Sequence, residues 1–247
     1  AAAAGVRSGR YDLIVADFLF QAVNVPREIA IPTVLFQHNV EAMIWKRHVE
    51  VQRNVVARRY FDAQWRRMVA FEREACRKFD LVVAVSQEDC DKMRSDYQLE
   101  RVEHIPTGVD TDFFRPAGDI ATNAHSLVFT GSMDWMPNED AIQYFLEQIF
   151  PRVRQAIAGA TLEVVGRSPS SAIQELAIRH PGVVVTGRVP DVRPYIEKAA
   201  CFIVPIRIGG GTRLKIFEAM AMEKPVVSTT IGAEGLPIAD GSDLILA

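Results

Sequence analysis

The fold of this 247-residue chain is decided by the stretch SLVFTGSMDWMPNEDAIQYFLEQI at residues 126–149. The stretch opens with a short apolar run that leads directly into Gly131. Pro137 then begins a segment whose apolar side chains recur at helical spacing. A second run, rich in valine, follows at 161–165. A buried strand, a helix and another buried strand in this order predict a parallel sheet with a crossover helix.

The same alternation continues in both directions from this stretch. Further apolar runs that we interpret as buried strands lie at residues 13–16, 33–36, 81–85, 183–186, 201–204 and 225–228. Helical patterns stand between several of them, including 60–79 and the run TRLKIFEAMAM at 212–222. The predicted fold class is therefore α/β, with two Rossmann-like, doubly wound parallel sheets.

A domain boundary is predicted within residues 106–125. Pro106, Thr107 and Gly108 have the chemistry of a turn, and residues 116–124 are mostly small and polar. We therefore expect an N-terminal domain over 1–115 and a C-terminal domain over 116–247. The first domain offers few strands and the last apolar run has no helix after it, so we expect an incomplete chain that lacks the N-terminal part and the C-terminal helices.

Composition excludes several classes of protein. Hydrophobic residues make up 49% of the chain, and 28 Lys and Arg against 31 Asp and Glu give a net charge of −3. This balance excludes a disordered chain, and the slight net acidity argues against nucleic acid as a partner. Cysteine occurs at positions 76, 90 and 201, too widely spaced for a disulfide framework or a metal site, so we expect a cytoplasmic protein.

A strongly basic segment runs from Lys46 to Lys78. It holds ten Lys and Arg against four acidic residues, and Trp45, Tyr60 and Trp65 are interleaved with it. The favoured interpretation is the solvated outer face of a helix. The alternative is a peripheral contact with anionic headgroups at the inner face of the membrane, or with an anionic acceptor.

Three glycines, at positions 209–211, precede Thr212 and a predicted helix that starts with two cations, Arg213 and Lys215. Cations in a first helical turn oppose the helix dipole, and an anion bound there would remove the conflict. A diphosphate suits the combination of a guanidinium and an ammonium. The alternative is a flexible loop with a solvated helix. Glu218, one turn beyond Lys215, either pairs with it at the surface or accepts hydrogen bonds from a ribose.

Two other predicted strand ends carry polar or flexible residues. Gly131 and Ser132 follow the strand at 126–130, where a missing side chain lets a ligand approach the backbone closely. His38 and Asn39 follow the strand at 33–36. Asn39 is predicted to cap the next helix, and His38 is a candidate for proton transfer or hydrogen bonding in a cleft.

These motifs resemble those of a known enzyme family. The run PIRIGGGTRLKIFEAMAMEKPVVSTTIGAEGL at 205–236 resembles the donor-binding half of retaining, GT-B-fold group-1 (family 4) glycosyltransferases, in a variant similar to exopolysaccharide sugar transferases. HIPTGVDTDFFRP at 104–116 is similar to the interdomain signature of that family. VVAVSQEDCDKM at 82–93 and FTGSMDWMPNEDAIQYF at 129–145 also match its style.

The resemblance implies transfer of a sugar from a UDP- or GDP-linked donor, bound in the C-terminal domain, to a sugar or lipid-linked acceptor. It implies retention of configuration and neither a metal nor a separate cofactor. The implied catalytic residues are His38, Arg213 and Lys215. The implied donor-binding residues are Gly131, Ser132, Gly209, Gly210, Gly211, Thr212, Arg213, Lys215 and Glu218.

The chain departs from the family pattern at three positions. Gly210 stands where the family has the first Glu of a pair, and Ser132 and Asn138 stand where it has two basic residues. Arg213 and Lys215 are expected to compensate for the lost cations. A nucleotide-sugar epimerase of the same fold and a non-catalytic nucleotide-sugar-binding module remain as alternatives. A dehydrogenase is disfavoured because no GxGxxG motif is present.

Overall fold

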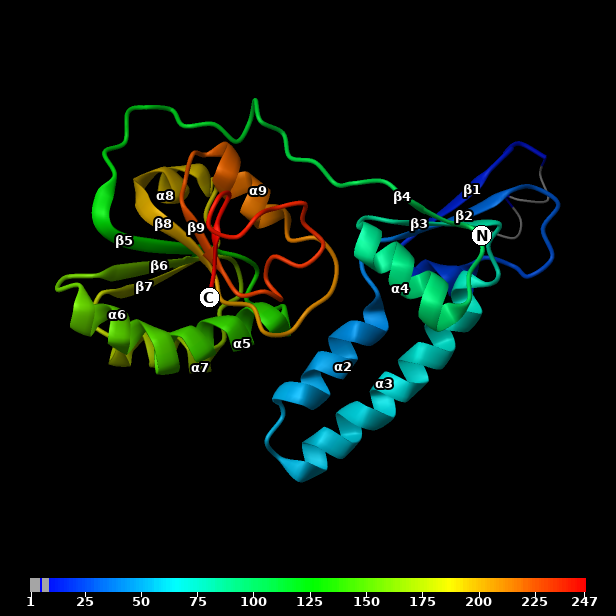
Figure 1. Ribbon diagram of the computed structural model, residues 1–247, viewed down its shortest axis with the longest axis horizontal. Coiled ribbons are helices and arrows are strands. Elements are labelled where there is room, and N and C mark those ends of the chain that lie inside the picture. Colours follow the sequence, from blue (N-terminus) through cyan, green and yellow to red (C-terminus); the bar gives the residue numbers. More distant parts are fainter. Residues whose placement is uncertain (1–4, 6–8) are drawn as a thin grey trace. The chain divides into compact units, whose positions relative to one another are not determined.

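The computed structural model describes Gly5 and residues 9–247. The chain divides into two compact units, each with its own parallel sheet. The first unit extends to Thr107 and also includes Gly210–Thr212, and the second consists of Gly108–Gly209 and Arg213–Ala247. The predicted fold class, two α/β units with parallel sheets, is confirmed (Figure 1).

The first unit contains a four-stranded sheet in the order β1-β2-β3-β4. Its strands are β1 (Ile14–Asp17), β2 (Thr33–Gln37), β3 (Leu81–Ala84) and β4 (Val102–His104). Its helices are the 3-10 helix η1 (Leu19–Asn24), α2 (Glu41–Val51), α3 (Val55–Cys76) and α4 (Gln87–Tyr97). Leu35, Val82 and Ala84 of the strands pack with Cys90 and Met93 of α4, and all five are almost fully buried. The apolar runs thus became the interior of this sheet, as their continuous hydrophobicity predicts.

The second unit contains a six-stranded sheet in the order β10-β9-β8-β5-β6-β7. Its strands are β5 (Asn123–Thr130), β6 (Thr161–Val165), β7 (Val183–Gly187), β8 (Ala199–Val204), β9 (Val226–Ser228) and β10 (Ile245–Leu246). Its helices are α5 (Met136–Tyr144), the π-helical turn η2 (Phe145–Ile149), α6 (Phe150–Ala156), α7 (Ser171–Arg179), α8 (Arg193–Lys198) and α9 (Leu214–Ala221).

Helices cover both faces of this second sheet. Helices α5, α6 and α7 lie on one face and α8 and α9 on the other (Figure 1). Ile142 and Leu146 belong to the apolar cluster on the first face, whereas Ile196 and Ile216 belong to the cluster on the second. The strand order reverses between β5 and β8, because β6 and β7 are added on one side of β5 whereas β8, β9 and β10 are added on the other. In such sheets ligands bind at the carboxyl ends of the strands beside this switch point.

The helix predicted over residues 60–79 has other bounds in the structure. The helix expected over 60–79 is α3, which begins at Val55 because the side chain of Asn54 accepts hydrogen bonds from the backbone N–H groups of Val56 and Ala57. It ends at Cys76, and Arg77 occupies the C-cap position. The hydrophobic stripe reveals where a helix packs but not where its polar ends are satisfied, and this accounts for the shift.

The segment that enters β5 is held against α8. The buried carboxylate of Glu197 accepts hydrogen bonds from the backbone N–H groups of Ala117 and Gly118, at 3.1 and 2.6 Å. The guanidinium of Arg193 lies 3.9 Å from the ring centroid of Phe113. Polar residues of α8 therefore fix a stretch that has no regular structure of its own.

Candidate functional site

The carboxyl ends of β5 and β6 meet at two glycines. The Gly131 N–H donates to the carbonyl of Val165 at 2.9 Å. A Cβ placed on Gly166 would lie only 1.8 Å from the carbonyl oxygen of Gly131. Only glycine at position 166 permits this approach of the two backbones, so positions 131 and 166 contribute no side chain of their own to the edge beside the switch point.

The ammonium group of Lys215 lies at the same edge. Its Nζ donates a 3.1 Å hydrogen bond to Asn138 Oδ1 and stands 4.2 Å from the ring centroid of Phe129. A Cβ on Gly131 would come within 2.8 Å of Nζ. Glycine at this position therefore makes the room that the lysine tip occupies. The strand end after β5 and the first turn of α9, distant in sequence, thus meet.

Burial of the Lys215 ammonium, together with the neighbouring positive charge of Arg213, lowers its pKa to about 7, and the charge of Glu218 opposes this shift. Burial also raises the pKa of Glu218, and the charge of Lys215 lowers it. Lys215 and Glu218 are therefore coupled within a desolvated environment rather than paired at an open surface. A cation held this way gains from the arrival of an anion.

Asn138 links Lys215 to the turn after β5. Its side chain, 7% exposed, donates from Nδ2 to the carbonyl of Ser132 at 2.8 Å while its Oδ1 accepts from Lys215. Asn138 lies in the first turn of α5, after Pro137. One amide thus fixes both the strand-to-helix turn and the position of the ammonium.

Ser132 takes part in a neighbouring polar cluster. Its hydroxyl donates to Asp134 Oδ1 at 2.5 Å and accepts from Arg167 Nε at 2.7 Å. Arg167 directly follows Gly166 at the end of β6 and is largely exposed, and its Nε lies 3.5 Å from Asp134 Oδ2, so the cluster holds one cation and one anion. The sequence analysis did not include Arg167, although Gly166 and Arg167 follow an apolar run in the same way as Gly131 and Ser132 do.

The glycine-rich segment is divided between the two units. Gly209 has φ +152°, and a Cβ there would lie 1.9 Å from a terminal nitrogen of the Arg213 guanidinium. Arg213 occupies the N-cap position of α9. Gly209 and Arg213 thus belong with Lys215 in the second unit, whereas Gly210, Gly211 and Thr212 group with the first. Three of the predicted donor-binding residues are therefore grouped with the first unit.

His38 lies in the first unit, immediately after β2. Its Nε2 is 2.6 Å from Asp17 Oδ1 at the end of β1, and its ring stacks on Phe18 with centroids 4.0 Å apart. Phe18 has φ +73°, an uncommon backbone conformation for a bulky residue. Such conformations concentrate at functional sites, because the surrounding contacts must maintain them. The imidazole is thus held in one orientation by a carboxylate and an aromatic ring.

Asn39 does not cap the next helix, contrary to the sequence prediction. The N-cap of α2 is Val40, which has no capping side chain. The carboxylate of Glu72, from α3, accepts hydrogen bonds from the backbone N–H groups of Glu41 and Ala42 instead, at 2.9 and 3.0 Å. Because Asn39 lies one residue before the N-cap, a buried carboxylate from another helix replaces the local cap.

Glu72 is fully buried and has two further donors. Tyr97 donates to it at 2.6 Å and Gln37 at 3.2 Å. Burial raises the pKa of Glu72 more than the hydrogen bonds from Tyr97, Ala42 and Glu41 lower it, and the resulting pKa is about 7. This carboxylate ties α3, α4 and β2 to the start of α2, and so fixes the turn that carries His38.

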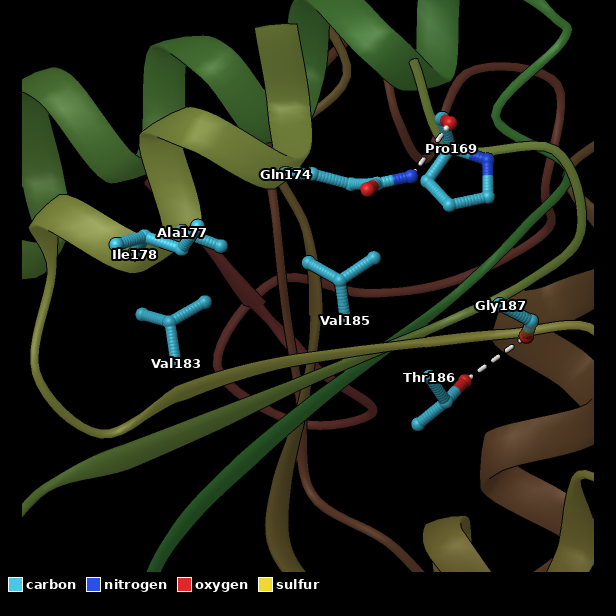
Figure 2. A pocket seen from close by; sticks show the side chains of 8 residues that line it. All are labelled: Pro169, Gln174, Ala177, Ile178, Val183, Val185, Thr186 and Gly187. Atoms are coloured by element: carbon cyan, nitrogen blue, oxygen red, sulfur yellow. Dashed lines mark hydrogen bonds between the residues drawn. The ribbon is translucent and has the colours of Figure 1, made fainter. Parts of the chain in front are cut away.

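A hollow of about 410 Å³ lies elsewhere in the second unit, between α7 and the edge strand β7 (Figure 2). Figure 2 shows Ile178, Val183 and Val185 in its wall, together with Gln174. Its lining has no charged side chain, so it does not suit a phosphate group. We therefore place the candidate site at Lys215 rather than in this hollow.

In Gly5 and 9–247, no group of three or more His, Cys, Asp or Glu side chains is arranged to hold a metal ion. Within the same residues, no helix combines the length and the apolar character that a bilayer span requires.

Known proteins resemble the chain over nearly its whole length. The sequence-family model for glycosyl transferases group 1 matches residues 124–247 of the chain, and the family model for Glycosyltransferase Family 4 matches residues 1–113. A curated relative, an uncharacterised 44.6 kDa protein in the cps region of Klebsiella pneumoniae, is 23% identical over 96% of this chain and 62% of its own length. The chain thus spans less than two thirds of that relative.

Solved structures share the fold. HepE of Anabaena, determined in complex with UDP, has a TM-score of 0.71 and 17% identity, covering 100% of this chain and 67% of its own. Sucrose-phosphate synthase from Thermosynechococcus elongatus has a TM-score of 0.68 and 18% identity, covering 93% of this chain and 59% of its own. At such identities the similarity shows a common GT-B architecture. The family-model match over residues 124–247 shows that the chain belongs to the group-1 glycosyltransferase family.

Proposed function

We propose that the protein is a retaining glycosyltransferase that moves a hexose from a nucleoside-diphosphate sugar to the hydroxyl group of an acceptor. The acceptor would be a sugar, free or carried on a lipid, in the assembly of a polysaccharide. Membership of the group-1 family supports glycosyl transfer. The location of the curated relative's gene in a cps region agrees with polysaccharide synthesis.

One observation carries the proposal: the ammonium of Lys215 lies 3.1 Å from Asn138 Oδ1, at the switch point of the donor-side sheet. The resemblance places one of the family's basic residues at Asn138. Lys215 would therefore supply from α9 the positive charge that this chain lacks at position 138. A diphosphate beside Gly131 would then meet Arg213 and the desolvated ammonium of Lys215, and charge pairing is stronger where water is excluded.

The proposed reaction is a transfer with retention of configuration. The bond between the anomeric carbon and the diphosphate oxygen breaks, and the acceptor oxygen bonds to the same carbon on the same face. The acceptor proton passes to an oxygen of the leaving diphosphate. Arg213 and Lys215 stabilise the charge that develops on that group. His38 would contact the donor sugar, and Glu218 would accept hydrogen bonds from the ribose hydroxyls.

A uridine diphosphate donor is favoured over a guanosine one. The solved structures of Anabaena HepE include complexes with UDP and with UDP-glucose. They cover all of this chain, which supports the choice without fixing the sugar.

The test is binding and turnover by the full-length protein. Calorimetry with UDP, GDP and ADP should give clear binding of UDP, and a labelled UDP-sugar should yield labelled acceptor. Lys215→Met should reduce UDP affinity at least tenfold, whereas Lys198→Met, a partly exposed lysine paired with Glu163, should leave it unchanged. Isomerised sugar without transfer would assign an epimerase, and binding without turnover would assign a non-catalytic module. Failure to bind any nucleotide would refute the site itself.

A further inference from the structure

The turn between α2 and α3 carries an exposed surface that combines aliphatic and basic side chains. Val55, Val56 and Tyr60 are 66%, 79% and 56% exposed. The exposed basic members are Arg53, Arg58 and Arg59. We call these six residues the hairpin tip. Two adjacent valines this open to water are unfavourable in an isolated surface and point to a partner that covers them.

The hairpin tip is held rigidly. The side chain of Asn54 accepts hydrogen bonds from the backbone of Val56 at 2.9 Å and Ala57 at 3.1 Å, so both valines belong to an ordered first turn of α3. Behind the tip, the ring of His48 on α2 stacks on Phe61 of α3 with centroids 4.9 Å apart. Figure 1 shows the α2–α3 turn at the end of the hairpin remote from the sheet β1–β4. The valines therefore cannot turn inward without breaking these contacts.

The charges of the hairpin tip are not neutralised by the chain around it. Residues 51–61 contain three arginines and no acidic residue. The nearest acidic neighbours in sequence have cations of their own: Glu50 lies 4.0 Å from Lys46, and Asp62 lies 3.0 Å from Arg66. Among the ion pairs of the described residues, none involves Arg53, Arg58 or Arg59. The tip thus offers three positive charges to an outside anion.

Helical spacing combines the two kinds of side chain. Val55 and Arg59 lie one turn apart, as do Val56 and Tyr60, so each pair lies on one side of α3. An amphipathic surface of this kind matches the headgroup region of an anionic bilayer, where apolar side chains enter among the acyl chains and arginines meet the phosphates. A nucleic acid would satisfy the arginines and leave the valines exposed.

We propose that the hairpin tip docks the protein on the surface of a membrane that contains anionic lipids. Val55, Val56 and Tyr60 enter the interface, and Arg53, Arg58 and Arg59 bind lipid phosphates. This contact is peripheral, and it is independent of the proposed donor site, since none of its residues belongs to that site. It would keep the enzyme at the surface where a lipid-linked acceptor is presented.

The experiment is vesicle co-sedimentation of the full-length protein. Vesicles of phosphatidylcholine with phosphatidylglycerol should bind it, and vesicles of phosphatidylcholine alone should bind it much less. Replacing Arg58 and Arg59 together by Gln should weaken binding about 25-fold, from roughly fivefold for each basic residue. Val55→Ser with Val56→Ser should weaken it as well, even at the high salt that screens the arginines.

A matched control comes from α7, where Ile178 is 83% exposed and Arg179 is its exposed neighbour. Ile178→Ser with Arg179→Gln removes one exposed aliphatic side chain and one exposed cation from α7, outside the hairpin tip, and should leave vesicle binding unchanged. Circular dichroism spectra and UDP affinity should be unaltered in the hairpin-tip variants and in the α7 control. This result would distinguish a loss of membrane binding from a loss of donor binding or of folding. Equal loss in the control, or binding that ignores lipid charge, would overturn it. Binding to a single-stranded oligonucleotide that needs the arginines but not the valines would instead assign the tip to nucleic acid.

Discussion

The hydroxyl group of Tyr97 donates a 2.6 Å hydrogen bond to Glu72 Oε2, the same oxygen that accepts from the backbone N–H of Ala42 at 3.0 Å. A tyrosine at the end of α4 thus helps to orient the carboxylate that caps α2. Both residues are buried, at 2% and 0% exposure, so water does not replace either partner. The start of α2, and the turn with His38 just before it, depend on this buried pair.

Tyr97→Phe should destabilise the protein by about 1–3 kcal/mol, because it removes a donor from a buried carboxylate without changing the packing much. The pKa of Glu72 should rise further, since the Tyr97 hydrogen bond lowers it. Urea unfolding measures the change. Tyr60→Phe, at a 56% exposed position, is the control and should change stability by less than about 0.5 kcal/mol. Equal effects of the two substitutions would contradict the role given to Tyr97.

The titration of Glu72 should appear in the pH dependence of stability. Its pKa is about 7 in the folded chain against 4.5 ordinarily, so between these values the folded state binds the proton more often. The protonated side chain therefore adds its full contribution to the free energy of unfolding below pH 4.5, and this contribution is lost as the pH rises through 7. This contribution is about 3 kcal/mol, because each unit of difference between the folded and ordinary pKa corresponds to about 1.36 kcal/mol.

Glu72→Gln removes this titration. The stability advantage of the natural chain over the variant should be largest near pH 5 and shrink toward pH 8. Urea unfolding at several pH values checks it. A difference that stays constant over this range would show that Glu72 is ionised throughout.

Binding of UDP should be coupled to proton uptake by Lys215. The pKa of this ammonium is about 7 without ligand, and a diphosphate beside it would raise that value. At pH 8 most of the molecules must then take up a proton as they bind. Calorimetry in buffers of different ionisation enthalpy counts these protons. We expect a value approaching one for the natural chain and near zero for Lys215→Met, and affinity that weakens above pH 7.

Two glycine substitutions should separate binding from folding. In Gly131→Ala the new Cβ meets Lys215 Nζ at 2.8 Å and Asn138 Nδ2 at 2.9 Å, so both side chains must shift. Because these neighbours are side chains rather than backbone, the fold should survive while UDP affinity falls. In Gly166→Ala the Cβ meets the backbone oxygen of Gly131 at 1.8 Å, and stability should fall by about 3 kcal/mol.

Gly108→Ala is the control for both, since a Cβ there has no neighbour within 4 Å and requires no unusual backbone angle. Thermal unfolding and UDP titration of the three variants test the distinction. If Gly131→Ala unfolded the chain as readily as Gly166→Ala, the room around Lys215 would be structural only.

Much of the fold followed from local patterns. The valine-rich run at 161–165 is β6 with the predicted bounds, and the run at 126–130 is the buried end of β5. The predicted stripe on the helix after Pro137 is buried at Ala141, Ile142 and Leu146. Continuous apolar runs specify buried parallel strands because both faces of such a sheet are covered.

The sequence by itself determined the parallel α/β architecture, the strand-end turns and the two cations at the start of α9, because each of these features depends on residues that are close together in the sequence. Tertiary structure alone decided that Lys215 meets Asn138, 77 residues away, and that Glu72 rather than Asn39 caps α2. Local periodicity says which faces are buried. It does not say which buried polar groups will meet, because those partners are chosen by how whole elements pack.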